Sequence, residues 1–366
     1  MIKGLIIVLC LMGLANVASA SLVVRKTYYR DTNLSLHVFL ENRGTEPMAL
    51  KAPIVGGFDT ATLGRDGKTA GSVLWYRCWP NPVPPGGIAD MTITMAAAPD
   101  GPIEIEIPAG AGSRISVSVP CKPEAFRFQA IRFSKDLCTV YAYLRWADGD
   151  SDESLKSIRI DGRSVARQAA PWPARGSDGL AYVKIALKTP LEKGSFHVFE
   201  AETASGLSTA YQIRAIPAEF IVGTYGAASP TNIRDWAAHE LNHYLSFGSL
   251  PPEVMSILSA NGLSCGARWI PEPLSDRKAG KVLAFDEEAS LEIIKGLAAD
   301  ENVLYHSLVD EPDVDDYFAG RRLGACGMEL VAREELCREA DPGHYTFVQL
   351  DNTFRPRNYQ VYGGSA

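Results

Sequence analysis

Several features that would assign a functional class at once are missing from this 366-residue sequence. It has no excess of basic residues, since 36 Lys and Arg stand against 43 Asp and Glu and the formal net charge is −7 at pH 7. Nucleic acids and anionic membranes need cationic side chains to neutralise their phosphates, so we expect neither as a partner. After the N-terminal segment no run of about 18 apolar residues occurs, and we expect no membrane span in the mature chain.

Motifs for metals, redox chemistry and nucleotides are missing as well. None of the seven cysteines belongs to a C-x-x-C pair of the kind that zinc and redox sites use. Gly223 and Gly226, at and after the end of the first predicted strand of the C-terminal region, lack the spacing of the dinucleotide-binding fingerprint. We therefore expect no metal and no organic cofactor.

The N-terminus has the three parts of a secretory signal. Met1-Ile2-Lys3 supplies a positive charge, the residues from Gly4 to Leu14 are almost wholly apolar, and Ala18-Ser19-Ala20 fits the small-x-small rule for cleavage. We predict a signal peptide over residues 1–20 and a mature chain that begins at Ser21. The protein is then secreted or periplasmic.

Export would permit disulfides among the six cysteines that remain after Cys10 is removed with the signal peptide. Six cysteines allow 15 connectivities, and the sequence alone does not choose among them. We favour a bond between Cys78 and Cys121, because both lie in the first predicted domain. The alternative is buried thiols without any bond.

Residues 21–217 alternate between apolar and polar side chains with the period of β-strands. The pattern is clearest at Leu34, Leu36, Val38 and Leu40 and again at Ile103, Ile105 and Ile107. Gly- and Pro-rich turns separate the short strands, as in immunoglobulin-like β-sandwiches. We predict two all-β sandwiches, over residues 21–120 and 121–217.

Residues 218–366 alternate between strand and helix, which predicts a parallel sheet with helical crossovers. Five strands are expected, at Phe220–Gly223, Tyr244–Phe247, Cys265–Ile270, Val303–Val309 and Tyr345–Leu350. Both a (β/α)8 barrel and an open sheet fit this pattern, and we favour the barrel. A whole barrel needs about 250 residues, so we expect an incomplete α/β (TIM-type) barrel that is the first part of a longer chain. A complete five-stranded open sheet is the alternative.

Asp310-Glu311-Pro312 follows the fourth of these strands directly. In a barrel the carboxyl ends of the strands converge on one mouth, where active sites form. A carboxylic acid placed there can protonate a glycosidic oxygen if its surroundings raise its pKa. The alternative interpretation is an acidic helix N-terminus, because negative charge suits the positive end of a helix.

With Val309 before it, this motif resembles that of the TIM-barrel glycoside hydrolases of the large retaining clan, whose acid/base glutamate ends the fourth strand. In that clan the glutamate usually follows Asn and often precedes Pro, whereas this chain has Asp310. The resemblance implies that Glu311 is the proton donor and Asp310 a neighbouring substrate-binding residue. It also implies a nucleophilic glutamate at the seventh strand, a strand that this sequence does not contain, so the nucleophile is not assigned.

Other residues at predicted strand ends are candidates for binding a carbohydrate substrate. They follow the first, third and fifth strands: Tyr225, Arg268, Trp269, Asp351 and Asn352. An aromatic ring could stack on a sugar face and an arginine could orient a carboxylate. For each of them a role in packing or loop structure is the competing interpretation.

Two other functions fit parts of the sequence. His239, Glu240 and His243 reproduce the H-E-x-x-H pattern of zinc metalloproteases, in which two histidines share one face of a helix. The apolar stripe before them favours an ordinary crossover helix that ends near His243. The second alternative is a non-catalytic glycan-binding or surface protein built on the same folds. Nothing in the sequence predicts an oligomeric state.

Overall fold

The computed structural model describes residues 22–65, 71–147, 154–165, 179–218, 221–245, 250–267, 275–276, 281–282, 286–310, 324 and 326–349. The signal peptide predicted at residues 1–20 lies outside these ranges. In the described part of the chain, no helix combines the length and apolar character that crossing a bilayer requires.

Two four-stranded antiparallel sheets form a first sandwich. One sheet has the order β1-β2-β6-β5, with β1 at Leu22–Arg30, β2 at Ser35–Asn42, β5 at Val73–Trp79 and β6 at Ile88–Met95. The other has the order β4-β3-β7-β8, with β3 at Ile54–Val55, β4 at Phe58–Asp59, β7 at Ile103–Pro108 and β8 at Arg114–Val119. The predicted alternation places Leu36 and Val38 of one sheet and Ile105 and Ile107 of the other in a shared core.

A second pair of antiparallel sheets follows. The order β13-β10-β9 joins β9 at Phe126–Phe133, β10 at Thr139–Trp146 and β13 at Leu180–Ala186. The order β12-β11-β14-β15 joins β11 at Leu155–Ile160, β12 at Arg163–Ser164, β14 at Phe196–Thr203 and β15 at Ser208–Arg214. Their inner faces share a core that includes Phe128, Val140, Ile158 and Phe199. Both pairs are consistent with the predicted β-sandwiches.

A five-stranded parallel sheet forms the third body. Its order is β16-β17-β18-β21-β22, with β16 at Gly223–Thr224, β17 at His243–Tyr244, β18 at Ser264–Ala267, β21 at Val303–Asp310 and β22 at Tyr345–Gln349. The helices between them are α1 at Pro230–Ala238, α2 at Pro252–Ala260, α3 at Glu287–Ala298 and α5 at Gly327–Ala340, and a short hairpin joins β19 at Ser275–Asp276 to β20 at Lys281–Val282. Neighbouring strands are consecutive in the chain, apart from this hairpin. The described strands form an open parallel sheet, which both the predicted incomplete barrel and the alternative five-stranded open sheet would give, and no closed barrel occurs among them.

The predicted disulfide between Cys78 and Cys121 is not formed, and none of the six described cysteines takes part in a disulfide. The reason is topological. Cys78 lies on β5, at one edge of its sheet, whereas β8, which leads to Cys121, packs near β1 at the opposite edge. Burial raises the pKa of the Cys78 thiol well above its usual range, so this thiol is protonated and unreactive.

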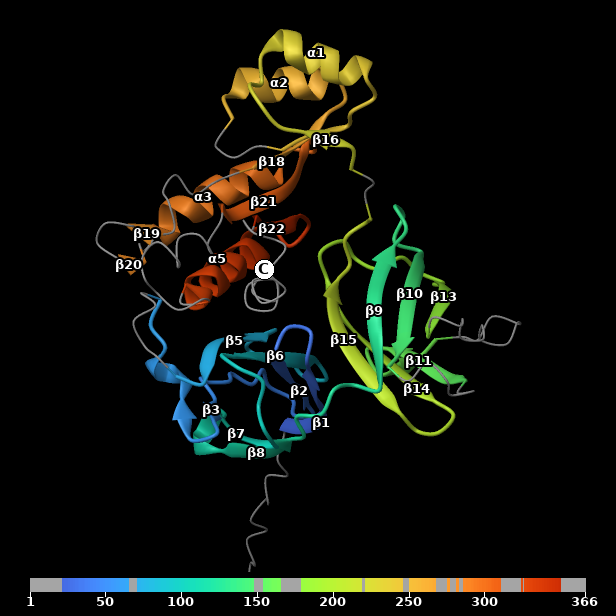
Figure 1. Ribbon diagram of the computed structural model, residues 1–366, viewed down its shortest axis with the longest axis vertical. Helices are drawn as coiled ribbons and strands as arrows, with labels where there is room; N and C mark the ends of the chain where they lie inside the picture. Colours follow the sequence, from blue (N-terminus) through green and yellow to red (C-terminus); the bar gives the residue numbers. More distant parts are fainter. Residues whose placement is uncertain are drawn as a thin grey trace, which may run out of the picture.

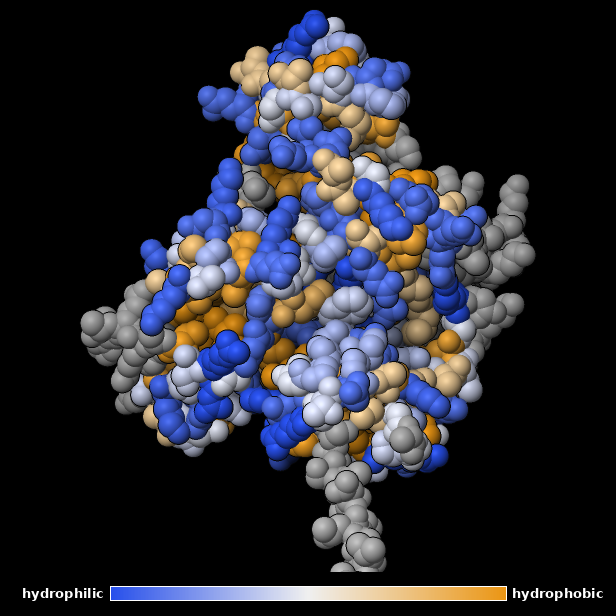
Figure 2. Space-filling model, turned by 180° about the vertical axis from the view of Figure 1, so that it is seen from behind, coloured by the Kyte–Doolittle hydropathy of each residue, from blue (hydrophilic) through white to orange (hydrophobic). Residues whose placement is uncertain are grey.

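Helix α5 lies between the parallel sheet and the first sandwich (Figure 1). Trp75 of β5 and Leu330 of α5 are fully buried in this contact, together with Val309 of β21. Gly327 opens the helix directly against the Trp75 ring, where a larger residue would overlap the indole. Seen from behind, hydrophobic residues gather on the lobe that the second sandwich forms (Figure 2).

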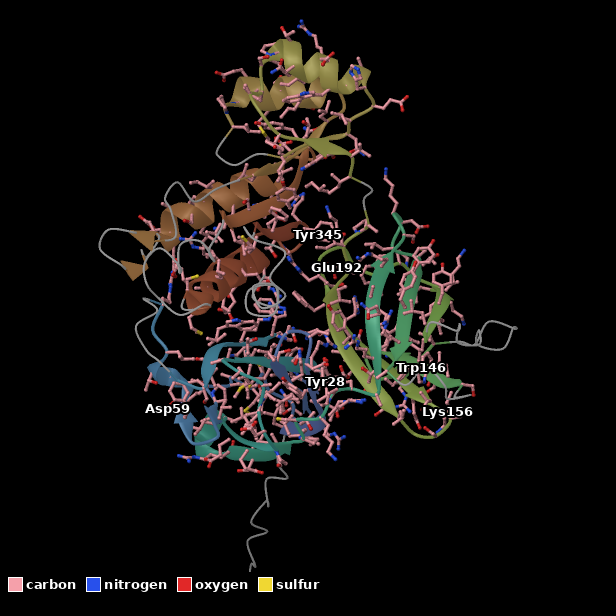
Figure 3. The ribbon with its side chains drawn as sticks, viewed as in Figure 1. Tyr28, Asp59, Trp146, Lys156, Glu192 and Tyr345 are labelled. Atoms are coloured by element: carbon pink, nitrogen blue, oxygen red, sulfur yellow. The ribbon has the colours of Figure 1, made fainter. Side chains whose placement is uncertain are left out.

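Hydrogen bonds join the second sandwich to each of the other two bodies. Tyr345 of β22 donates its hydroxyl to the carbonyl of Pro217 at 2.8 Å. Figure 3 labels Tyr345 close to Glu192 of the second sandwich. Towards the first sandwich, Arg25 Nη2 donates to both carboxylate oxygens of Glu200 at 2.9 and 3.0 Å. The three bodies are therefore joined by specific hydrogen bonds as well as by apolar contacts.

The parallel sheet contains one position where only glycine fits. A Cβ on Gly266 would overlap the ring of Tyr305 on the neighbouring strand, and Tyr305 itself packs between His243 and Phe347. We expect Gly266→Ala to lower the free energy of unfolding by about 1–3 kcal/mol, the usual cost of overpacking. Urea unfolding measures this loss.

Gly296 is the matched control, because it lies in α3 with open space around its Cα. There the same substitution should stabilise the protein by about 0.5–1 kcal/mol, since alanine is the better helix former. A Gly266→Ala variant as stable as Gly296→Ala would contradict the packing described for the sheet.

Candidate functional site

The carboxyl edge of the parallel sheet is the position where the sequence predicts the site. Most of the predicted site residues lie outside the described residues: Arg268, Trp269, Glu311, Asp351 and Asn352. The strands that lead to them are described, and they end at Ala267, Asp310 and Gln349. Because β18, β21 and β22 are parallel neighbours, these three ends lie along one edge.

The register shows how the strand ends are arranged. Asp310 pairs with Gln349, so β21 and β22 end level with each other. Ala267, the last residue of β18, pairs with His306. Asp310 thus lies four residues, or about 13 Å, further along β21 than the residue that pairs with Ala267. It is the last residue of β21 and directly precedes Glu311.

Tyr225 is the predicted site residue whose side chain is described. It follows β16 directly and is 71% exposed, more than any other large hydrophobic residue in the described part of the chain. The side chain of Tyr225 therefore lies at the surface, beyond the carboxyl end of β16. Its role in stacking on a sugar stays a prediction.

Three aromatic rings cover the sheet on the side away from α1 and α2. The ring of Tyr305 lies 5.3 Å from that of His243 and 5.0 Å from that of Phe347, measured between centroids. His243 Nδ1 is 2.9 Å from Ser264 Oγ. Burial lowers the pKa of His243 to about 4 and raises that of Tyr305, so both groups are neutral at pH 7. This face is an uncharged aromatic layer that extends towards the strand ends.

The zinc-protease interpretation of His239, Glu240 and His243 is wrong. Helix α1 ends at Ala238, and Glu240 adopts a left-handed backbone with φ of 61°. His243 is then buried on β17, whereas the side chain of His239 is 71% exposed. The two histidines do not share a helical face, because the chain turns between them to enter the sheet.

A buried group that the sequence analysis missed joins β21 to the segment after α5. His306 Nε2 lies 2.7 Å from Asp341 Oδ2, and His344 Nδ1 lies 2.6 Å from the same oxygen. All three residues are at least nine-tenths buried. The Asp-x-x-His spacing of Asp341 and His344 was visible in the sequence, but the approach of His306 depends on the fold.

Two imidazoles and a carboxylate are a donor set that divalent metals use. Here each imidazole nitrogen donates a proton to the carboxylate, so a metal would have to displace both protons. The group also lies where the chain enters β22, at the amino edge of the sheet. In parallel α/β folds that edge supports stability and the opposite edge carries the chemistry. We interpret His306, Asp341 and His344 as a hydrogen-bonded group with a structural role, and we call it the relay.

This relay predicts a dependence of stability on pH. Burial alone would raise the pKa of Asp341, but the hydrogen bonds from His306 and His344 outweigh it and hold this pKa well below its usual range. A carboxyl whose pKa is lowered by folding contributes stability above its unfolded value of about 3.9, and the contribution is lost as the pH falls further.

We expect Asp341→Asn to lower the free energy of unfolding by about 1.5–3 kcal/mol at pH 7, because charge-assisted hydrogen bonds are lost. The difference from the parent protein should shrink as the pH falls below about 4. Asp100→Asn, at an exposed position, is the control for a change of charge alone. A difference that stays constant with pH would contradict the relay.

Two Ser–His–Asp arrays, which are the arrangement of a nucleophilic triad, also escaped the sequence analysis. Their atoms are joined in order at 2.7–2.9 Å, in Ser35–His37–Asp90 and in Ser195–His197–Asp161. In each array the serine and histidine are two residues apart at the start of a strand. The repeated Ser-x-His pattern was the available signal.

Neither array is arranged to activate its serine. Ser35 donates its proton to Asn33 Oδ1 at 2.5 Å, and Ser195 donates to the carbonyl of Glu192 at 2.6 Å. The serine proton is thereby directed away from the neighbouring histidine nitrogen, which is the reverse of the arrangement that activates a serine. Both arrays are hydrogen-bonded supports within the sandwiches.

Comparisons with known proteins find only weak likenesses. No protein-family model matches this sequence, and no curated protein matches it. A Parabacteroides merdae beta-glucuronidase structure covers 72% of this chain at 11% identity with a TM-score of 0.27, and the match spans 38% of that enzyme. Tandem Ig repeats of Dlar cover 52% of this chain and 94% of their own at 13% identity and a TM-score of 0.26.

A Bacteroides ovatus mixed-linkage glucan utilization protein, SGBP-B, solved with a mixed-linkage heptasaccharide, covers 49% of this chain and 40% of its own at 11% identity. Its TM-score is 0.17. These values are too low to assign a fold family or a function to the chain.

Proposed function

We propose that this chain is part of an exported glycoside hydrolase that acts on an oligo- or polysaccharide, with Glu311 as its catalytic acid. The observation that carries the proposal is the position of β21. It is the fourth strand of the parallel sheet, and it ends at Asp310, the residue immediately before Glu311.

The strand order supports a barrel as the parent architecture. In a doubly wound sheet the order reverses at a switch point, whereas consecutive strands are neighbours throughout a (β/α)8 barrel. Here β16, β17, β18, β21 and β22 follow one another without reversal. We propose that they are the first five strands of such a barrel, whose carboxyl edge would form the active-site mouth.

The proposed chemistry uses two carboxyl groups. Glu311 would protonate the leaving-group oxygen and then, as a carboxylate, activate water against a glycosyl-enzyme intermediate formed by a second carboxylate. That second carboxylate is not assigned. We propose that Asp310 contacts the sugar beside Glu311 and that the exposed ring of Tyr225 stacks on it. Arg268, Trp269, Asp351 and Asn352 complete the proposed sugar-binding edge.

The test is turnover of a panel of aryl glycosides and oligosaccharides by the protein as its cells make it. Proton NMR of the first product should show retention of the anomeric configuration. Inversion would contradict the mechanism, and saturable oligosaccharide binding without turnover would favour the glycan-binding alternative. The weak likeness to beta-glucuronidase is compatible with this proposal but does not carry it.

A further inference from the structure

A cavity of about 450 Å³ lies where the three bodies meet. The first sandwich contributes Arg77 and Asp90, and the second contributes residues of β9, β14 and β15. Helix α5 and β22 of the third body close it. Its volume is in the range of small-molecule sites, which are common at domain junctions. No step of the proposed glycoside hydrolysis uses this cavity.

The charges that line the cavity do not balance. Four guanidinium groups face it, those of Arg77, Arg132, Arg214 and Arg338, against the two carboxylates of Asp90 and Glu334. Two of the arginines share one of those carboxylates. Arg77 Nη1 lies 3.4 Å from Glu334 Oε2, and Arg338 Nε contacts the other oxygen of Glu334.

The other two arginines form no ion pair among the described residues. Arg214 donates to the carbonyl of His344 at 3.1 Å and to Thr346 Oγ1 at 3.4 Å, and Arg132 donates to the carbonyl of Ile131 at 3.2 Å. Glu334 and Asp341 act on Arg214 through space, and Arg132 is exposed to solvent. The lining of the cavity nevertheless holds more arginines than carboxylates.

The positive charges of these arginines also repel one another. Burial and the neighbouring charges of Arg77 and Arg214 lower the pKa of Arg338 to about 9, although Glu334 acts in the opposite direction. Two of these guanidinium groups make cation–π contacts with Phe196. Its ring centroid lies 4.8 Å from Arg338 Cζ and 5.9 Å from Arg214 Cζ. A bound anion would relieve this repulsion without moving the arginines.

A second observation concerns Asp90, which is 93% buried and lines the same cavity. Its Oδ2 is 2.9 Å from His37 Nδ1 and accepts from Thr92 at 3.3 Å. Its Oδ1 is buried and has no hydrogen-bond partner in the part of the chain that the structure describes. Because this oxygen has almost no accessible surface, a ligand in the cavity does not reach it, and Asp90 contributes only its negative charge to the lining.

We propose that the junction cavity binds a small organic anion, whose charged group is held by Arg132, Arg214 and Arg338. The excess of arginines over carboxylates along the lining requires a negative group. Sugar carboxylates and sugar phosphates share this chemistry. Because the ligand contacts the second sandwich and helix α5, its binding stabilises their packing.

The test is calorimetric titration of the protein with gluconate, glucose 6-phosphate and neutral glucose, with thermal unfolding as a second readout. We expect saturable binding and a raised Tm with at least one of the two anions and neither effect with glucose. The tighter of the two anions identifies the carboxylate or the phosphate as the natural charged group. Equal binding of glucose, or no binding of either anion, would overturn the proposal.

Arg214→Gln should weaken anion binding at least tenfold. If that variant fails to fold, Arg132→Gln serves instead, because the Arg132 guanidinium hydrogen bonds only to the carbonyl of Ile131 among the described residues. Arg114→Gln, whose side chain is 64% exposed on β8, is the matched control and should bind like the parent protein. Unchanged affinity in Arg132→Gln and Arg214→Gln would place the anion elsewhere and overturn the proposal. Neither result bears on Glu311.

Discussion

Glu311→Gln is expected to lower the turnover of glycosides with ordinary alcohol leaving groups by about 10²–10⁴-fold, the usual contribution of general acid catalysis. The substitution keeps the size of the side chain but removes the proton that the leaving oxygen needs. We expect the free energy of unfolding to stay within about 0.5 kcal/mol, as for substitutions that break no structural contact. Steady-state kinetics and urea unfolding of the same preparation measure both effects.

Glu301→Gln is the matched control, because Glu301 is exposed just before β21, at the opposite end of the same strand. Its activity should equal that of the parent protein. Asp310→Asn provides a second comparison, since it restores the asparagine that the resembling clan carries, and turnover should persist. Undiminished activity of Glu311→Gln would remove Glu311 as the acid.

Arg333→Ala is expected to lower the free energy of unfolding by about 3–5 kcal/mol, because it breaks a buried ion pair from one side. Arg333 is 1% exposed on α5, and its Nε donates to Glu329 at 3.0 Å. Its Nη1 donates to the carbonyl of Leu308 on β21 at 2.9 Å. The substitution would leave the buried Glu329 with one cation fewer and that carbonyl without this donor.

Leu308 lies three residues before Glu311, so Arg333 is a positioning residue for the strand that leads to the proposed acid. We expect Arg333→Lys to recover part of the stability. Lysine keeps the charge but lacks the planar guanidinium that donates to both Glu329 and the Leu308 carbonyl. Arg114→Ala, at an exposed ion pair, should change stability by less than about 0.5 kcal/mol. If Arg333→Ala lowered the free energy of unfolding by less than about 1 kcal/mol, the role given to the hydrogen bonds of Arg333 would be contradicted.

Local pattern predicted the strands but not every buried face. The alternation at β2 predicts that Leu36 and Val38 are buried and that His37 and Phe39 face water, yet His37 is 6% and Phe39 1% exposed. The second sandwich covers that face, since Phe39 packs against Val198 and Ala210. Such contacts join residues far apart in the chain, and no local periodicity encodes them.

The same reason explains the polar clusters that the sequence analysis missed. Helix α5 carries Glu329, Arg333, Glu334 and Arg338, which have the composition of a solvated helix face but are buried between the sheet and the first sandwich. The carboxyl edge of the parallel sheet was more predictable, because a strand end is a local feature. The positions of Tyr225 after β16 and of Asp310 at the end of β21 follow from strand boundaries alone, whereas their role in a site stays a prediction.

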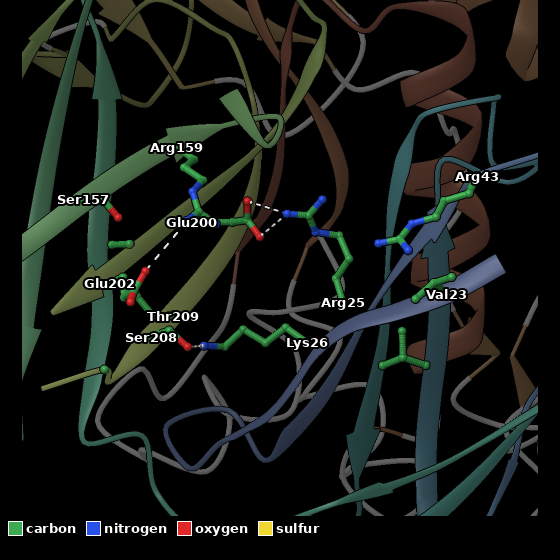
Figure 4. A pocket seen from close by; sticks show the side chains of 13 residues that line it. Val23, Arg25, Lys26, Arg43, Ser157, Arg159, Glu200, Glu202, Ser208 and Thr209 are labelled. Carbon is green, nitrogen blue, oxygen red and sulfur yellow. Dashed lines mark hydrogen bonds and ion pairs between the residues drawn. The ribbon is translucent and has the colours of Figure 1, made fainter. Parts of the chain in front are cut away.

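Another polar surface shows how charges become partners only in the fold. The cleft between the two sandwiches, of about 510 Å³, brings Lys26 of β1 to Ser208 of β15 at 2.7 Å (Figure 4). Burial lowers the pKa of Lys26 to about 8. These residues are 182 positions apart in the chain, so sequence spacing gave no indication of the contact.

The leaving-group dependence of Glu311→Gln tests the proposed acid most directly. A nitrophenolate leaves without protonation, whereas an alkoxide needs the acid. We predict that the variant loses at least a hundredfold in kcat/KM with an alkyl glycoside or disaccharide and less than tenfold with a dinitrophenyl glycoside of the same sugar. Equal losses with both substrates would contradict the role of Glu311 and, with it, the active site proposed at the end of β21.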